Sequence, residues 1–162
     1  MVWIIMGVSG SGKTTVGKKL AKRLNIPFYD GDNFHPKENV EKMQSGRPLN
    51  DDDRKPWLVT LANKINEWNN NKGAVLACSA LKLSYRKLLT SKSDDVQFVY
   101  LKGNRETIFN RMKSRSDHYM PAKLLDSQFE ALEEPASALT VSVEGNPSEI
   151  TDRIIKRFLS RE

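Results

Sequence analysis

Five short apolar runs, each followed by an amphipathic stretch, limit what this chain can fold into more than any other feature of its sequence. Strands that alternate with helices indicate an α/β fold with a largely parallel sheet. Two of the runs, VWIIM and AVLACSA, are apolar throughout, as expected of central strands that helices cover on both faces. The other three are PFYDGD, VQFVYLKG and ALTVSVEG. We therefore expect a five-stranded, mostly parallel sheet in a three-layer α/β/α arrangement.

The stretches between the runs have the period of amphipathic helices. The first and the last place an apolar residue at every fourth position, which predicts a face that packs on the sheet. These residues are Val16, Leu20 and Leu24 in the first stretch and Ile150, Ile154 and Phe158 in the last. Asn146 and Pro147 fit a helix cap and a first helical position, so the last helix should begin there.

The composition fits one globular domain over residues 1–162. The chain is 38% hydrophobic and 28% charged, and no linker-like segment divides it. Its formal net charge of +6 favours anionic partners, but the basic residues are dispersed, so most of them belong on solvated helix faces. The single cysteine, Cys78, leaves no partner for an intramolecular disulfide and fits a small buried strand residue.

The amino-terminal segment MVWIIMGVSG has no basic residues and only a short apolar run. It fits neither a signal peptide nor a membrane-spanning helix. We expect a cytoplasmic protein with no membrane partner. A nucleic acid partner is also not expected, because the sequence has no basic stripe and no aromatic RNA-binding motif.

A glycine-rich loop follows the first apolar run. Residues 7–14, GVSGSGKT, fit the pattern G-x-x-x-x-G-K-[ST], whose glycines let backbone N–H groups approach phosphate oxygens at the positive end of a helix. Lys13 would reach the β- and γ-phosphates, and Thr14 would offer a hydroxyl to Mg²⁺. A chance glycine-rich turn is the alternative, but the flanking strand and helix favour a nucleoside triphosphate site. The residues assigned to the nucleotide are Gly7, Ser9, Gly10, Ser11, Gly12, Lys13, Thr14 and Thr15.

The rest of the sequence narrows the class of nucleotide-binding protein. No N-K-x-D motif for reading guanine is present, and no D-x-x-G follows the second run. Kinases and ATPases remain. A small-molecule kinase fits a phosphate-loop core, an acceptor-binding segment and a lid into 162 residues, whereas motor and switch ATPases need further segments.

Asp30 and Asp32 end the second run. In a strand they would share one face, at the carboxyl edge where open α/β sheets bind ligands. One carboxylate could hold the water shell of Mg²⁺, while the other accepts a hydrogen bond from an acceptor hydroxyl. The alternative is a pair that only closes the strand through an Asx turn, which Gly31 and Asn33 would also suit.

At this point the sequence resembles a known family. The segment DGDNFHPKENVEKMQSGRPLNDDDRKPWL, with MGVSGSGKT before it and CSALK after it, is similar to the gluconokinases of the shikimate-kinase-like P-loop group. The resemblance covers nearly the whole chain. It implies ATP-dependent phosphorylation of D-gluconate at its terminal hydroxyl, giving 6-phosphogluconate, usually by a homodimer.

The resemblance also implies roles for single residues. Asp32 matches the carboxylate that holds the acceptor hydroxyls, Asp30 the one near Mg²⁺, and Arg54 the guanidinium that faces the substrate. His35, from the HP of the family pattern, is either a hydroxyl contact or a brace of the turn before Pro36. The acceptor-binding segment would span about residues 33–70.

Pro56 gives an independent argument about Arg54. Proline is tolerated in the first turn of a helix, so we expect a helix that begins near Asp53, with Asp53 as its cap. Arg54 would then lie in the first turn, where its positive charge is unfavourable next to the positive end of the helix dipole. A nearby anion would offset this cost. The carboxylate of a bound aldonate could be that anion and would pair with the Arg54 guanidinium through two hydrogen bonds. Alternatively, the carboxylates of Asp51, Asp52 and Asp53 could offset the charge without a ligand.

Two further segments complete the expected site. The segment CSALK supplies Ser79 and Lys82 at the same sheet edge, and in the family it faces the acceptor. Arg111 and Arg115 are four residues apart, so on a helix they face one side, either as solvated charges or within a mobile lid over about residues 111–128. We assign Arg111 to the nucleotide, and Lys13, Asp32 and Arg115 to catalysis by in-line transfer, in which Asp32 orients the acceptor more than it deprotonates it.

Two alternative functions stay open at this stage. Another small-molecule kinase, acting on shikimate or a nucleotide, would share the phosphate loop and the arginines, but it gives no reason for the HPKEN to DRKPWL segment. A nucleic-acid-linked regulatory NTPase would use the net charge and would show salt-sensitive binding to an oligonucleotide.

Overall fold

The computed structural model describes residues 1–113 and 122–161. The strands are β1 (Val2–Met6), β2 (Phe28–Asp30), β3 (Ala74–Ala77), β4 (Val96–Lys102) and β5 (Leu139–Ser142). The helices are α1 (Lys13–Leu24), α2 (Lys37–Gln44), α3 (Asp51–Asn69), α4 (Leu83–Leu89), α5 (Arg105–Lys113), α6 (Ala122–Ala131) and α7 (Pro147–Leu159), with a 3-10 turn, η1 (Gly31–Phe34). The predicted α/β class and the five strands are confirmed.

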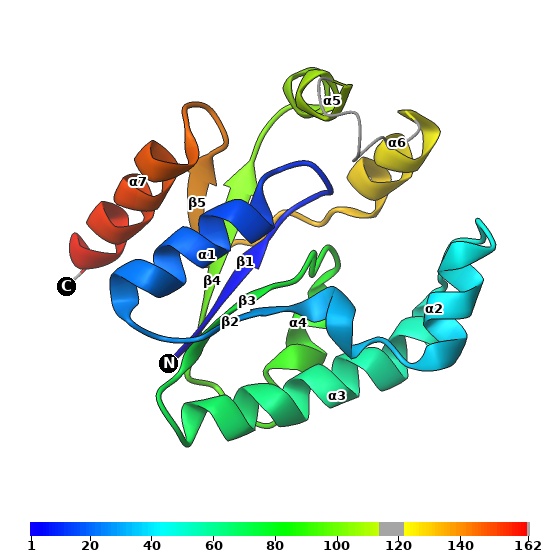
Figure 1. Cartoon of the computed structure of the whole chain (residues 1–162), viewed down its shortest axis with the longest axis horizontal. Helices are drawn as coiled ribbons and strands as arrows, with labels where there is room; N and C mark the ends of the chain where they lie inside the picture. Colours follow the sequence, from blue (N-terminus) through cyan, green and yellow to red (C-terminus); the bar gives the residue numbers. More distant parts are fainter. Residues whose placement is uncertain (114–121, 162) are drawn as a thin grey trace.

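The strands form one parallel sheet in the order β2-β3-β1-β4-β5. After β1 the chain forms β2 and β3 on one side of β1, and it then crosses to form β4 and β5 on the other side. The direction in which strands are added therefore reverses at β1. Open α/β sheets bind ligands at the carboxyl ends of the strands at such a point. Figure 1 shows α2, α5 and α6 grouped beyond these carboxyl ends.

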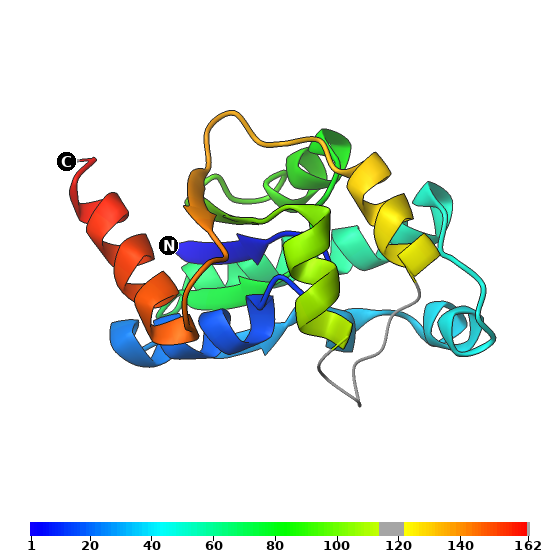
Figure 2. The same ribbon diagram turned by 90° about the horizontal axis from the view of Figure 1, so that it is seen from above.

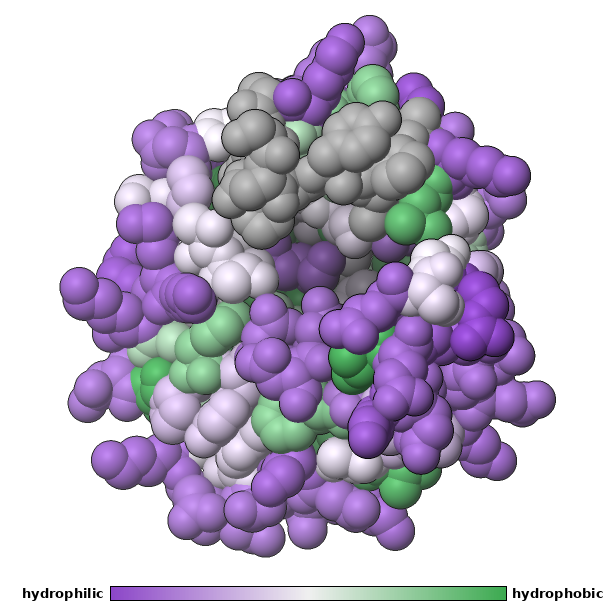
Figure 3. All heavy atoms as spheres, turned by 45° about the vertical axis from the view of Figure 1, so that its right-hand side comes forward, coloured by the Kyte–Doolittle hydropathy of each residue, from purple (hydrophilic) through white to green (hydrophobic). Residues whose placement is uncertain are grey.

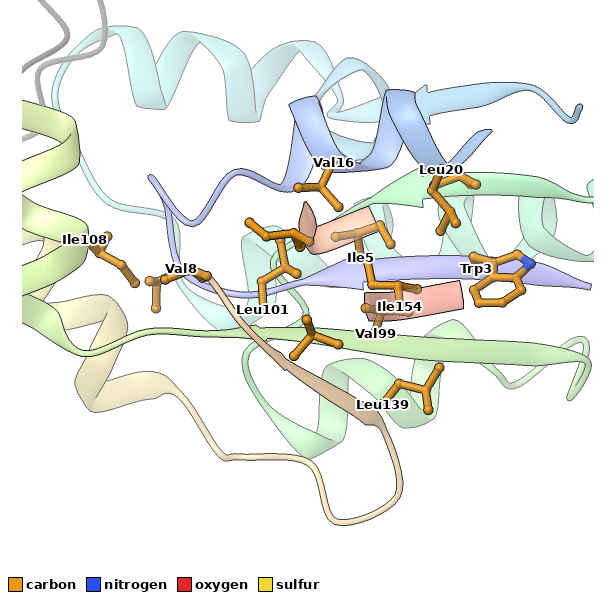
Figure 4. Close-up of a cluster of buried hydrophobic side chains, with 14 of the residues drawn as sticks. Trp3, Ile5, Val8, Val16, Leu20, Val99, Leu101, Ile108, Leu139 and Ile154 are labelled. Carbon is orange, nitrogen blue, oxygen red and sulfur yellow. The ribbon is translucent and has the colours of Figure 1, made fainter. Parts of the chain in front are cut away.

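Helices cover both faces of the sheet, and α1 and α4 lie on opposite sides of it in Figure 2. Residues of β1 alternate between the two layers, because successive side chains of a strand point to opposite faces. Trp3 and Ile5 join a cluster with α1 and α7, whereas Ile4 packs with α3 and α4. Figure 4 shows the first cluster, in which Val16 of α1 meets Ile5.

The helix faces agree with the predicted periodicity. Val16, Leu20, Ile150 and Ile154 are buried, and Leu24 and Phe158 pack against the same cluster while partly exposed. The last helix begins at Pro147 after an Asn146 cap, as predicted. Cys78 is buried, and burial raises the pKa of its thiol to about 12, so it is a core residue and not a nucleophile.

On the face drawn in Figure 3, hydrophilic side chains predominate and hydrophobic ones form small separate areas. Within residues 1–113 and 122–161, none of the helices combines the length and apolar character that a membrane crossing requires.

Candidate active site

The loop after β1 has the geometry that its sequence predicts. Gly10 and Gly12 both have positive φ, at +81° and +95°, a conformation that favours glycine. A Cβ on Gly10 would lie 2.4 Å from Cγ of Met112, so this glycine also lets the loop pack against α5. Gly12 caps α1, and the free N–H groups of the first helical turn follow it directly.

The Lys13 ammonium lies over this loop. Its Nζ donates to the carbonyl oxygens of Gly7 and Val8, each at 3.1 Å. Burial lowers the pKa of Lys13, while the nearby carboxylates of Asp32 and Asp30 oppose this shift and favour its charged form. The two carboxylates and the phosphate loop are therefore brought together around Lys13.

The expectation that Asp30 and Asp32 share a strand face is wrong. β2 ends at Asp30, and Asp32 lies in η1, where its N–H donates to Oδ1 of Asp30 at 3.0 Å. Gly31 makes this turn possible, because a Cβ there would lie 2.9 Å from the carbonyl oxygen of Ala77. The Asx turn, which was the alternative interpretation of this Asp pair, is thus present. Both carboxylates still lie near Lys13.

The pKa of Asp32 is raised, by desolvation and by repulsion from the Asp30 carboxylate, and Lys13 opposes the shift. Asp32 as a whole residue is exposed to solvent.

The predicted start of α3 near Asp53, with Asp53 as its cap, is also wrong, because the observed cap is Asn50, three residues earlier. The helix begins at Asp51, and Asn50 caps it through a box in which the Asn50 side chain accepts the Asp53 N–H while Asp53 accepts the Asn50 N–H. Pro56 therefore lies inside the helix, where it removes the hydrogen bond to the carbonyl of Asp52. Because Asp52 is exposed, water can satisfy that carbonyl.

Asp51 is the anion that joins Arg54 in this structure. Its carboxylate lies 3.1 Å from Nζ of Lys82 and 4.0 Å from Nη1 of Arg54, and it accepts a short hydrogen bond from the Tyr85 hydroxyl. That hydroxyl also accepts from Nη1 of Arg54 at 3.2 Å. Hydrogen bonds from Tyr85 and Lys82 lower the pKa of Asp51, which keeps it ionised. We call these four residues, Asp51, Arg54, Lys82 and Tyr85, the cation cluster.

The cation cluster borders a hollow of about 490 Å³. Its lining residues are Leu49, Asn50, Asp51, Asp52, Arg54 and Lys82. A second hollow, of about 270 Å³, lies at the phosphate loop. Its lining includes Gly10, Ser11, Gly12, Thr15 and Arg111.

His35 lies between η1 and α3. Its ring stacks on Trp57 of α3, with centroids 4.1 Å apart, and its Nδ1 lies 3.2 Å from Nδ2 of Asn39. Trp57 in turn donates from Nε1 to the carbonyl of Gly31 at 2.8 Å. The ring therefore braces the turn before Pro36. Burial, followed by the nearby Arg54 charge, lowers the pKa of His35 to about 4.

The remaining predicted residues divide between described and undescribed parts of the chain. The Ser79 carbonyl accepts the Gly7 N–H at 3.3 Å, which ties β3 to the phosphate loop. Arg111 lies at the end of α5 beside that loop. Arg115, with most of the amino-terminal half of the predicted lid, lies outside the described residues.

Two residues at the site were missed from the sequence. Tyr85 reaches the cation cluster from α4, and Gln128 of α6 contacts Ser9 in the phosphate loop. Spacing from Lys82 places Tyr85 one turn later on the same helix, which is a weak signal for the first. No sequence signal marks Gln128.

Comparisons with known proteins agree with this geometry. The shikimate kinase family profile matches residues 9–159. The thermoresistant gluconokinase of Escherichia coli (strain K12) is 46% identical over 137 residues, which are 84% of this chain and 78% of that protein. The chain belongs to the gluconokinase family. The gluconokinase of Gluconobacter oxydans (strain 621H) is 42% identical, over 98% of this chain and 92% of that protein.

A solved gluconokinase structure extends the match to three dimensions. The crystal structure of a gluconokinase from Sinorhizobium meliloti 1021 has a TM-score of 0.88 at 39% identity, and the match covers 96% of this chain and 89% of that chain. The family resemblance found in the sequence is thereby confirmed. As a member of the gluconokinase family the protein is a kinase, and its phosphoryl donor is ATP.

Proposed function

We propose that the protein phosphorylates D-gluconate with ATP to give 6-phospho-D-gluconate. The observation that carries this proposal is the cation cluster, which presents Arg54 and Lys82 to one hollow. An acid acceptor supplies the carboxylate that two converging cations bind, and guanidinium groups can bind a carboxylate through two parallel hydrogen bonds. Shikimate also carries a carboxylate, so identity to gluconokinases over most of the chain favours the aldonate.

The acceptor would bind with its carboxylate at Arg54 and Lys82 and its hydroxyl chain toward Asp32. In this pose Asp51 gives up part of its interaction with both cations when the acceptor arrives. His35 and Ser79 lie along the same edge of the sheet and are the proposed neutral contacts. Each cation already has a protein partner, so little side-chain ordering remains to be done on binding.

Transfer would follow an in-line path between the two substrates. Lys13 leaves the loop carbonyls for the β- and γ-phosphates, where it offsets charge in the transition state. Asp32 holds the attacking hydroxyl in line, and its raised pKa suits a group that orients and briefly shares a proton. Arg111 lies beside the loop for the phosphates, and Arg115 is proposed as its partner.

Mg²⁺ is the metal ion proposed to accompany ATP. Thr14 is exposed in the first turn of α1, and Asp30 has one carboxylate oxygen beyond the one that accepts the Asp32 N–H. These hard oxygen ligands suit Mg²⁺, which usually keeps several waters and phosphate oxygens. When bound, the ion would neutralise charge on the phosphates. A cytoplasmic homodimer is the proposed location and assembly.

The deciding experiment is an ADP-release assay with a panel of acceptors. We expect gluconate to be used well, and other aldonates, shikimate and nucleoside monophosphates poorly. Lys13→Ala, purified in parallel, should lose most turnover while it keeps its far-UV circular dichroism spectrum, which rules out a contaminating host kinase. Efficient phosphorylation of shikimate or a monophosphate would overturn the proposal.

A further inference from the structure

Gln128 makes a two-point contact with the phosphate loop. Its Oε1 accepts the backbone N–H of Ser9 at 2.7 Å, and its Nε2 lies 3.1 Å from the Ser9 hydroxyl oxygen. Ser9 is the third residue of the loop motif, whose backbone N–H groups face phosphate oxygens when a triphosphate is bound. The carboxamide oxygen thus accepts a hydrogen bond from the backbone of the loop that holds phosphate in this motif.

The backbone that carries Gln128 is firmly held. Leu125, one turn earlier in α6, is completely buried in the core, and Phe129 packs against the same cluster. An ion pair between Arg105 and Asp126 ties α6 to α5. The side chain therefore projects toward Ser9 from a fixed position and does not depend on a free loop.

The same segment also holds the acceptor side of the site. The N–H of Glu133 donates to the carbonyl of Leu81 at 2.8 Å, and the N–H of Leu83 donates to Oε1 of Glu133 at 2.7 Å. Leu81 and Leu83 flank Lys82 of the cation cluster. Gln128 is thus one end of a short connection between the phosphate loop and the acceptor hollow.

A carboxamide can interact both with a backbone N–H of the loop and with a phosphate oxygen, because it carries an acceptor and a donor. Its oxygen accepts an N–H when no phosphate is present, and its NH₂ group donates to a phosphate oxygen after rotation. A carboxylate of the same shape could accept the Ser9 N–H and hydroxyl equally well. It has no proton to donate, however, and it would repel a triphosphate.

We propose that Gln128 is a nucleotide-binding residue that yields the Ser9 N–H to the terminal phosphate of ATP and donates its own Nε2–H to an oxygen of that phosphate. The role in turnover rests on the proposed gluconokinase activity. The role in nucleotide binding does not. This difference allows the two proposals to be tested apart.

The experiment compares Gln128→Glu, Gln128→Ala and Ser127→Ala. Ser127 is the matched control, because it is the exposed neighbour on α6 and its hydroxyl donates to the carbonyl of Leu124 in the same helix. Calorimetry with a non-hydrolysable ATP analogue and Mg²⁺ gives the Kd for nucleotide. Thermal unfolding without ligand reports the empty state, and gluconate kinetics give KM and kcat.

We expect Gln128→Ala to weaken analogue binding by roughly 10- to 100-fold, as for loss of a hydrogen bond to a charged group. Gln128→Glu should weaken it further while it unfolds near the wild-type temperature, and Ser127→Ala should change neither. If Gln128 only braces the loop, Glu will bind the analogue as wild type does and Ala will be the weaker variant. That order of affinities overturns the inference. Failure of the wild type to use gluconate, with the expected order of affinities intact, would instead overturn only the proposed function.

Discussion

At the scale of single residues, Tyr85 organises the acceptor side of the site. Its hydroxyl lies between Asp51 and Arg54, and the ring lies 5.7 Å from the Arg54 guanidinium carbon and 5.6 Å from Nζ of Lys82. Desolvation and the hydrogen bond to Asp51 raise the pKa of Tyr85, so it remains a donor at neutral pH. The two cations are thereby held apart in fixed positions while Asp51 shields their mutual repulsion.

Arg54→Ala should therefore act on the acid acceptor and not on the nucleotide. We expect the KM for gluconate to rise by roughly 10- to 100-fold, because a charge-assisted pair to the acceptor is lost. The KM for ATP should stay near its wild-type value. Lys55→Ala is the matched control, since Lys55 is the exposed neighbour on α3. Equal increases in both KM values would contradict a role for Arg54 in holding the acceptor.

His35 predicts a pH dependence of stability. Its pKa falls from 6.5 to about 4 in the folded protein, so between these values the unfolded chain binds more protons. The contribution of the neutral ring is complete above pH 6.5 and is lost as the pH falls toward 4. Urea unfolding at pH 7 and pH 5 should show a larger loss of unfolding free energy in the wild type than in His35→Gln. His118 is common to both proteins and cancels in the difference. The same loss in both would exclude His35 as the cause.

At the scale of elements, the sequence predicted those features that depend on interactions between residues close together in the chain. The strands, the phosphate loop and the Asn146 cap follow from apolar runs, glycines and a capping pattern within a few residues. The start of α3 did not follow, because Pro56 and the Asn50–Asp53 capping box compete and the box prevails. Gln128 could not be found from the sequence, since its partner Ser9 lies 119 residues away in the chain, and Tyr85 was marked only by its spacing from Lys82, since Asp51 and Arg54 lie 34 and 31 residues before it.

The two capping boxes provide a comparison between elements. Asn50→Ala and Asn146→Ala each remove a side-chain acceptor from a helix amino end, and each should lower the free energy of unfolding by about 1 kcal/mol. Only α3 carries Asp51 and Arg54, so Asn50→Ala alone should also raise the KM for gluconate. Chemical denaturation and steady-state kinetics of both variants check this. A similar rise in KM for Asn146→Ala would show that the effect comes from general destabilisation.

At the scale of the whole molecule, the two halves of the site stand on opposite faces of one sheet. Val8 of the phosphate loop is buried in the cluster that contains α1 and α7 (Figure 4), whereas Trp57 anchors the acceptor helix α3 in the cluster on the other face. The strands are shared by both clusters. Both halves of the site are therefore supported by the same strands, and loosening either face should disturb both substrates.

This arrangement leads us to propose that residues 1–162 unfold as one domain, and matched core variants test it. Leu20 on α1 and Leu61 on α3 are both fully buried, one in each cluster. Leu20→Ala and Leu61→Ala should each reduce the unfolding free energy by about 2 to 5 kcal/mol and keep a single transition. Tryptophan fluorescence observes both faces, through Trp3 in one cluster and Trp57 and Trp68 in the other, and circular dichroism observes the helices. Coincident curves from the two probes in both variants are expected of one cooperative unit. Curves that separate in either variant would mean that the two faces unfold independently, and that the sheet does not couple the two substrate sites.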